Sequence, residues 1–202
     1  MQSSNPHKKE FFDEKAEEWD EMTTHDPKKL ELIVRLLALK QGQTVLDVGT
    51  GTGVMIPYLL KYVKENGKIV AVDYSRKMIE IAKRKHHPRE YPNVKFLVED
   101  INNLSMNHEY NAILCYSCFP HFSNKEAMIQ HLRGGLKRGG KLMIAHSESR
   151  DAINNLHKDT HEVSKDLLPP IGEIARMMES TGLTIIEEID NDEMFVIMAE
   201  QQ

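Results

Sequence analysis

The sequence is poor in the features that define secreted and membrane proteins. Its 202 residues include only two cysteines, Cys115 and Cys118, which could pair in principle but are expected to stay reduced in a chain without an export signal. No apolar run approaches the roughly 20 residues that a membrane-spanning helix needs. The first 21 residues are polar and mixed in charge, whereas a signal peptide carries an apolar segment. We therefore expect a cytoplasmic protein with reduced thiols and no membrane partner.

The sequence also lacks an excess of positive charge. The formal net charge is −5 at pH 7, so the chain has no general attraction for the phosphates of nucleic acids. The basic run Lys83–Arg89 is most simply a solvated helix end. With 40% hydrophobic and 28% charged residues, the composition is ordinary for one domain with a single core. We expect no nucleic-acid partner.

Short β-branched runs alternate with amphipathic stretches along most of the chain. Short apolar blocks predict strands, and apolar residues with helical spacing predict helices. Five successive strand–helix pairs predict a parallel sheet with helices on both faces, and two alternating runs joined by Asn191-Asp192 predict a closing hairpin. The expected strands are Thr44–Val48, Lys68–Asp73, Val94–Asp100, Asn111–Ser117, Gly140–Ser147, Leu183–Asp190 and Glu193–Glu200, and the expected helices are two within Phe11–Leu39, then Val54–Glu65, Ser75–His86, Asn124–Lys137, Ser149–Val163 and Ile171–Ser180.

Three glycines, Gly49, Gly51 and Gly53, lie between the first expected strand and its helix. In that place glycines allow a tight turn and let a ligand approach the backbone amides. Their spacing, G-T-G-T-G, differs from the G-x-G-x-x-G of dinucleotide-binding proteins, and the turn lacks the lysine of a phosphate-binding P-loop. The turn therefore predicts a ligand site that is neither a dinucleotide site nor a P-loop.

These features resemble those of a known family, the class I S-adenosylmethionine-dependent methyltransferases. The resemblance is carried by D-x-G-x-G-x-G at Asp47–Gly53, by the acid in KIVAVDYSRKM, by VEDINNL and by LKRGGKLMIAH. In the last motif Arg138 stands where the family has proline. The resemblance spans essentially the whole chain. It implies an α/β fold of the Rossmann-like three-layer type, with a mostly parallel seven-stranded sheet and an antiparallel C-terminal strand.

The resemblance also implies S-adenosylmethionine as the cofactor. This molecule carries a ribose, a sulfonium, an ammonium and a carboxylate but no phosphate, so its pocket needs acids as well as backbone amides at a helix N-terminus. Asp47, Asp73 and Asp100 lie at the C-terminal ends of successive strands and meet that need. The implied cofactor residues are Phe12 and Trp19 in a lid, Asp73 at the ribose, Tyr74 and Met78 beside the adenine, Asp100 and Ile101 at its edge, and Asp47, Gly49, Thr50, Gly51, Gly53 and Cys115 around the rest.

We expect one domain over residues 1–202 that methylates a small molecule. It comprises lid helices (1–40), a cofactor-binding core (41–147), an acceptor-side helical segment (148–182) and a closing hairpin (183–202). CYSCFP follows the fourth strand in place of the N-P-P-Y of amino-group methyltransferases. In-line attack on the methyl group would yield S-adenosylhomocysteine, in a monomer or homodimer. A non-catalytic sensor of S-adenosylmethionine or of a metal is the alternative from another class.

Histidines gather near the expected acceptor side, and three interpretations are open. His121 or His146 could be a general base that accepts a proton from the acceptor. Alternatively, His157 and His161, four apart on one helix face, could join His146 as ligands of a transition metal ion. The third interpretation is packing, in which the histidines and the nearby cysteines complete the core and the helix ends.

Overall fold

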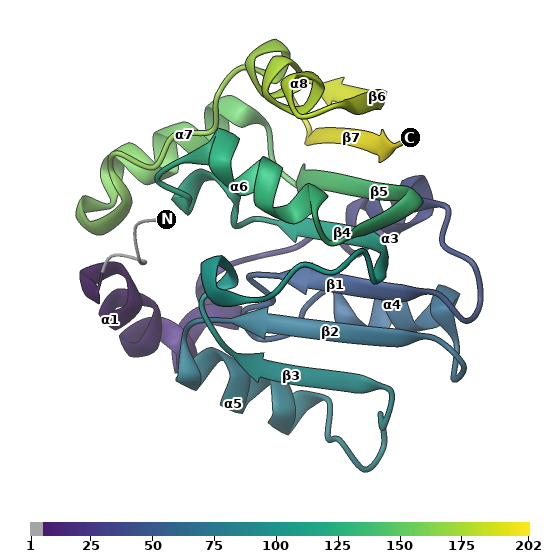
Figure 1. The fold of residues 1–202 in the computed structure, drawn as a ribbon. Helices are drawn as coiled ribbons and strands as arrows, with labels where there is room; N and C mark the ends of the chain where they lie inside the picture. Colours follow the sequence, from purple (N-terminus) through teal and green to yellow (C-terminus); the bar gives the residue numbers. More distant parts are fainter. Residues whose placement is uncertain (1–5) are drawn as a thin grey trace. The chain divides into compact units, whose positions relative to one another are not determined.

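The computed structural model describes residues 6–202 (Figure 1). The chain divides between Leu104 and Ser105 into two compact units, which we call the N-terminal unit and the C-terminal unit. The seven strands have the sheet order β3-β2-β1-β4-β5-β7-β6, of which the first three belong to the N-terminal unit. This order confirms the predicted α/β class and the mixed seven-stranded sheet, in which β7 is antiparallel.

The N-terminal unit contains three parallel strands, β1 (Thr44–Val48), β2 (Lys68–Asp73) and β3 (Val94–Val98). α4 packs on β2, and α5 packs on β2 and β3, so the apolar residues of these strands are removed from water. Figure 1 shows α1 beside α5. The helical elements of this unit are α1 (Pro6–Lys15), η1 (Ala16–Glu18), α2 (Trp19–Met22), α3 (Pro27–Leu37), α4 (Ile56–Val63), α5 (Arg76–Lys85) and η2 (Ile101–Asn103).

Local sequence sets the helix starts in this unit. Asp26 accepts a hydrogen bond from the Lys28 amide at 2.8 Å, and Pro27 occupies the first turn of α3, where no N–H is needed. Ser75, the predicted N-cap of α5, accepts a hydrogen bond from the Met78 amide at 3.2 Å. The predicted cap is therefore confirmed.

The C-terminal unit contains four strands. β4 and β5 are parallel, while β7 runs antiparallel to both β5 and β6. α8 packs against β6 and β7, and α6 packs against β5 and α8. The elements of this unit are β4 (Tyr110–Tyr116), η3 (Phe119–His121), α6 (Lys125–Arg133), β5 (Leu136–His146), α7 (Arg150–Asp159), η4 (His161–Val163), α8 (Ile171–Ser180), β6 (Leu183–Asp190) and β7 (Phe195–Gln201).

The helix predicted over Ser149–Val163 is shorter than expected. It ends at Asp159, because Thr160 is extended (φ −110°, ψ 109°). The threonine hydroxyl donates at 3.0 Å to a carbonyl of the last turn, which satisfies one of the acceptors that a helix end leaves open. His161 begins a separate 3₁₀ turn. The prediction that His157 and His161 share a helix face is therefore wrong.

The helix predicted over Asn124–Lys137 also ends early, at Arg133. A pair of glycines follows it, and glycine is the least favourable residue for a helix after proline. β5 then begins at Leu136, before the predicted start at Gly140. Within residues 6–202, no helix combines the length and the apolarity that crossing a bilayer demands.

Candidate functional site

The glycine-rich turn follows β1 in the N-terminal unit. Gly49, Gly51 and Gly53 have positive φ angles of 63°, 54° and 85°, which other residues rarely adopt. A Cβ atom at Gly53 would lie 2.9 Å from a ring carbon of His86, whereas a Cβ atom at Gly51 would meet nothing within 4 Å. Packing therefore requires a glycine at position 53, while Gly51 borders open space.

Replacing Gly51 with alanine is expected to weaken cofactor binding without unfolding the protein. The new methyl group would enter the open space where a ligand approaches the backbone amides. Gly42→Ala is the matched control, because Gly42 also has a positive φ, 84°, and also has nothing within 4 Å of the Cβ position. Each substitution costs ~1 kcal/mol or more in backbone strain. In calorimetry, only Gly51→Ala should weaken the binding of S-adenosylhomocysteine, by about tenfold or more, equivalent to ~1.4 kcal/mol; equal affinities of the two variants would contradict this prediction.

Asp73 lies at the end of β2 and binds the turn. Its Oδ2 accepts a hydrogen bond from the Gly51 amide at 2.9 Å, and its Oδ1 accepts one from the Ser75 amide at 2.8 Å. Burial raises the pKa of Asp73 to about 6, although backbone hydrogen bonds from Ser75, Gly51 and Tyr74 favour the charged form. An ionised carboxylate has about four acceptor positions. Three of these positions are taken by backbone amides, so the contact of Asp73 with the ribose stays a prediction.

The other two predicted acids have partners within the unit. The Thr50 hydroxyl donates to Oδ2 of Asp47 at 2.6 Å. Burial and, to a smaller extent, the charge of Asp73 raise the pKa of Asp47 to about 7. Asp100 accepts hydrogen bonds from the backbone and side-chain amides of Asn102. Asp47 thus stabilises the turn and Asp100 caps a short helix, while their contact with the cofactor stays a prediction.

The residues predicted to surround the adenine lie in the same unit. Phe12 is buried, and its ring lies edge-to-face against Trp19 and Tyr74, with centroids 5.4 Å and 6.1 Å away. Met78 and Ile101 are buried as well. The structure therefore brings the predicted lid residue Phe12 against Tyr74, which follows Asp73, and brings Trp19 against Phe12.

Acids of the N-terminal segment bind the glycine turn and α5. Asp20 accepts a hydrogen bond from the Thr52 hydroxyl at 2.6 Å, which ties the predicted lid directly to the turn. The contacts of this kind join Asp13 to Ser75, Glu17 to Arg84, and Asp20 to Thr52 and Lys85.

Asp20→Ala is expected to speed the release of bound cofactor about five- to tenfold. The lid would lose its hydrogen bond with Thr52, worth about 1 kcal/mol, and an ion pair with Lys85, worth ~0–1 kcal/mol at a partly exposed site. Glu31→Ala is the control, because it breaks another exposed ion pair of the same unit, with Lys61 at 2.8 Å. Stopped-flow fluorescence measures the release rate. Equal release rates in the two variants would show that the Asp20 contact does not hold the lid.

The C-terminal unit contains the predicted acceptor-side histidines, of which His146 is the most deeply buried. Its side chain is 1% exposed and packs edge-to-face on Phe195. Among residues 6–202, neither ring nitrogen of His146 has a hydrogen-bond partner. Burial lowers the pKa of His146 to about 3, with smaller contributions from His121 and His157. His146 is therefore neutral near pH 7 and enclosed, which leaves His121 as the better placed of the two predicted bases.

His121 and His157 are both bound to Asp166. Oδ2 of Asp166 lies 2.8 Å from Nδ1 of His121, and the Asp166 carbonyl accepts a hydrogen bond from Nδ1 of His157. The two imidazole rings lie together, with centroids 5.0 Å apart and an angle of 31° between the planes. Because Nδ1 is the donor in each neutral ring, Nε2 carries the acceptor lone pair. A carboxylate bound to an imidazole in this way orients it as a base.

The histidines predicted as metal ligands do not gather into a site. His161 is exposed on η4, His146 is enclosed, and His157 is bound to Asp166. Across the part of the chain that the structure describes, no group of three or more His, Cys, Asp or Glu residues could hold a metal ion. Cys115, predicted near the cofactor, is a buried thiol on β4. The structure therefore gives the metal interpretation no support.

The sequence motifs predict no role for Asp166, the residue that binds His121 and His157. It lies in an irregular loop, 45 positions from His121, and no motif surrounds it. The one signal in the sequence is its place directly before the apolar run Leu167–Leu168. An acid in such a place is expected to be buried only when it has a partner.

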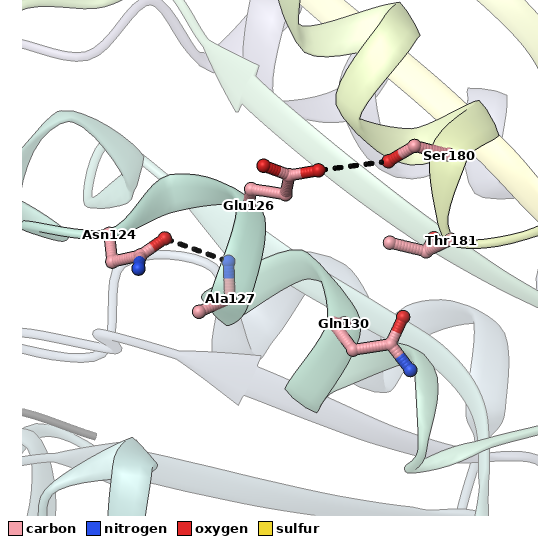
Figure 2. Close-up of a pocket in the computed structure, with 6 residues that line it drawn as sticks. All are labelled: Asn124, Glu126, Ala127, Gln130, Ser180 and Thr181. Atoms are coloured by element: carbon pink, nitrogen blue, oxygen red, sulfur yellow. Dashed lines mark hydrogen bonds between the residues drawn. The ribbon is translucent and has the colours of Figure 1, made fainter.

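A hollow on the C-terminal unit involves none of the predicted site residues (Figure 2). Its polar groups link α6 and α8 or cap α6. Glu126 accepts a hydrogen bond from the Ser180 hydroxyl at 3.2 Å, and Asn124 accepts one from the Ala127 amide at 3.0 Å. The lining residues are Asn124, Glu126, Ala127, Gln130, Ser180 and Thr181.

Comparison with known proteins agrees with this geometry. Residues 39–182 match a family described as a methyltransferase domain. The chain is 31% identical over 138 residues to malonyl-[acyl-carrier protein] O-methyltransferase 1 of Ilyobacter polytropus, covering 65% of this chain and 50% of that protein. It is 32% identical over 144 residues to demethylmenaquinone methyltransferase of Thermotoga maritima, covering 68% and 60%.

A solved structure extends the similarity to nearly the whole chain. It is a SAM-dependent methyltransferase from Aquifex aeolicus, with a TM-score of 0.72 and 25% identity, covering 93% of this chain and 97% of that one. By contrast, the chain spans about half the length of the curated relatives it matches.

Proposed function

This chain belongs to the class I S-adenosylmethionine-dependent methyltransferases, and we propose that it transfers the methyl group to a small-molecule acceptor and releases S-adenosylhomocysteine. The names of two relatives support a metabolic acceptor, since one is named for malonyl-[acyl-carrier protein] and the other for demethylmenaquinone. The net charge of −5 supports an acceptor other than nucleic acid.

The observation that carries the proposal is the hydrogen bond between the Asp73 carboxylate and the glycine turn. Asp73 accepts the Gly51 and Ser75 amides, and its carboxylate is the acceptor that we propose for the ribose hydroxyls. The backbone amides of the turn, at the start of α4, are suited to the carboxylate of the cofactor. Phe12 and Trp19 would cover the adenosyl part and exclude water.

The remaining requirement is an acceptor held in line with the methyl group. A sulfonium loses a neutral thioether, which is a good leaving group, so much of the rate enhancement comes from positioning in a closed site. We propose that His121 takes the acceptor proton, since its ring is oriented by a carboxylate at 2.8 Å.

The proposal is tested with methyl-labelled S-adenosylmethionine and an extract divided into small molecules and macromolecules. We expect label in the small-molecule fraction, matched by an equal amount of S-adenosylhomocysteine, and no transfer with Asp73→Ala. Label in protein or nucleic acid alone would overturn the acceptor class. Binding of the cofactor without any S-adenosylhomocysteine formation would favour a sensor over an enzyme.

A further inference from the structure

α7 fixes the backbone of the loop that carries Asp166. None of its own side chains is buried, so hydrophobic burial does not explain its position. Its Asn154 binds the Leu168 backbone twice, through the amide at 2.7 Å and the carbonyl at 3.0 Å. His157, three positions later on the same helix face, donates to the Asp166 carbonyl. Polar side chains of α7 therefore hold this loop at two points of its backbone.

The loop held in this way presents the Asp166 carboxylate to His121. The Asp166 side chain is 9% exposed and the His121 side chain 18%. A carboxylate so deeply buried requires a strong partner, and the 2.8 Å bond to Nδ1 of His121 supplies one. His121 ends η3, which begins three residues after the end of β4, so the pair joins two segments that are distant in the sequence.

The groups around His121 are consistent with a base that becomes charged during a reaction. Asp166 provides a negative charge at hydrogen-bond distance, and such a charge favours the imidazolium. The Lys125 ammonium of α6 donates to two backbone carbonyls of the neighbouring turn, at 3.0 Å and 3.1 Å. The titratable groups shown beside His121 include Asp166 of the loop, His157 of α7 and His146 of β5.

Building on the methyltransferase function proposed above, we propose that Asp166 is a positioning residue that holds His121 as the general base, and that the acceptor must lose a proton when it reacts. Hydroxyls, thiols and carbon acids are such acceptors. An ammonium group, the form of an alkyl amine near neutral pH, is another, whereas a carboxylate is already ionised and needs no base before attack. The pair therefore narrows the acceptor class beyond what the relatives' names indicate.

The proposed step is balanced in atoms and charge. The acceptor proton moves to Nε2 of His121, and the electron pair left on the acceptor forms the bond to the methyl carbon. The carbon–sulfur bond breaks with its electrons on sulfur, which turns the sulfonium into a neutral thioether. The imidazolium of His121 stays paired with the Asp166 carboxylate until the proton leaves to water.

The pair itself is tested by nitrogen-15 NMR of the histidine rings in the full chain. We expect His121 and His157 as Nδ1–H tautomers in the wild type. Asp166→Asn should lower the titration midpoint of His121 by about one unit or more, because the adjacent negative charge is lost. Asp159→Asn, at an exposed acid that ends α7, should leave the midpoint unchanged. Equal midpoints in the wild type and Asp166→Asn would overturn the pairing.

The catalytic role is tested by the rate of S-adenosylhomocysteine formation with the small-molecule fraction. Asp166→Asn should lower kcat about tenfold or more, leave the KM for S-adenosylmethionine within twofold, and shift the pH–rate profile. Asp166→Glu should recover part of the rate, since it keeps a carboxylate. An unchanged kcat in Asp166→Asn, or rate acceleration confined to carboxylate acceptors, would overturn the proposal.

Two outcomes need a second measurement: an Asp166→Asn variant that does not fold, and a wild type that shows no activity. If Asp166→Asn does not fold, Asn154→Ala loosens the same loop without touching the pair, and it should lower kcat several-fold; an unchanged kcat would overturn the positioning role. If the wild type forms no S-adenosylhomocysteine with any fraction, the proposed function fails, whereas an unshifted His121 midpoint in the NMR experiment refutes the pair alone.

Discussion

Asp73→Ala is expected to weaken the binding of S-adenosylhomocysteine about a hundredfold or more. The substitution removes the carboxylate that we propose accepts both ribose hydroxyls, and a hydrogen bond to a charged group contributes about 1.5–3 kcal/mol. It also removes the acceptor of the Gly51 amide. Asp26→Ala is the matched control, because Asp26 likewise accepts the amide two positions ahead, that of Lys28 at 2.8 Å. An equal loss of affinity in both variants would mean that a lost cap, and not a lost ligand, weakens binding.

The same carboxylate is expected to make binding depend on pH. Burial raises the pKa of Asp73 to about 6 in the ligand-free protein, whereas donated ribose hydroxyls favour the ionised form. Binding therefore releases a proton at low pH. The affinity should be full above about pH 7 and should fall as the pH falls through 6, approaching about tenfold per pH unit. Calorimetry from pH 7.5 to 5 measures this slope, which Asp73→Ala should abolish.

His146→Leu is expected to remove much of the sensitivity of the fold to acid. Burial lowers the pKa of His146 to about 3 in the folded protein, whereas the unfolded chain takes up a proton near pH 6.5. Above about pH 6.5 His146 is neutral in both states and leaves the unfolding free energy unchanged. As the pH falls from about 6.5 toward 3, the unfolded chain takes up a proton that the folded protein does not, and the unfolding free energy falls. The expected loss is ~1.4 kcal/mol per pH unit, or ~2 kcal/mol of unfolding free energy between pH 6.5 and 5.

Urea unfolding at pH 7, 6 and 5 measures this contribution. At pH 7 the leucine variant should be at least as stable as the wild type, because leucine leaves no buried polar atom without a partner. Asp47 and Asp73, whose pKa values are raised, act in the opposite direction, but they are the same in both proteins and cancel in the comparison. His161→Leu, at an exposed histidine of η4, is the control. Parallel loss of stability in the wild type and His146→Leu would contradict the burial of a neutral imidazole.

The cofactor side could be predicted from the sequence because its signals are local. The glycines lie within five positions of one another, and Ser75 and Asp73 lie within three. Turn geometry and helix capping depend on neighbours of this kind. The structure accordingly shows a turn with positive φ at Gly49, Gly51 and Gly53 and a cap at Ser75.

The acceptor side could not be predicted to the same depth, because its contacts are long-range. Thr160 stops a helix whose spacing alone continued to Val163, and this break separates His157 from His161. The bond between His121 and Asp166 spans 45 positions and depends on how α7 holds an irregular loop. No periodicity or motif in the sequence specifies a pairing of that kind.

The central claim is that Asp73 and the glycine turn form the site for the adenosyl cofactor. The most direct measurement is a crystal structure of the chain with S-adenosylhomocysteine. We predict both ribose hydroxyls within hydrogen-bond distance of the Asp73 carboxylate and the amino-acid end of the ligand against the turn that contains Gly51. A ligand bound elsewhere, with no ribose hydroxyl within hydrogen-bond distance of Asp73, would contradict this claim.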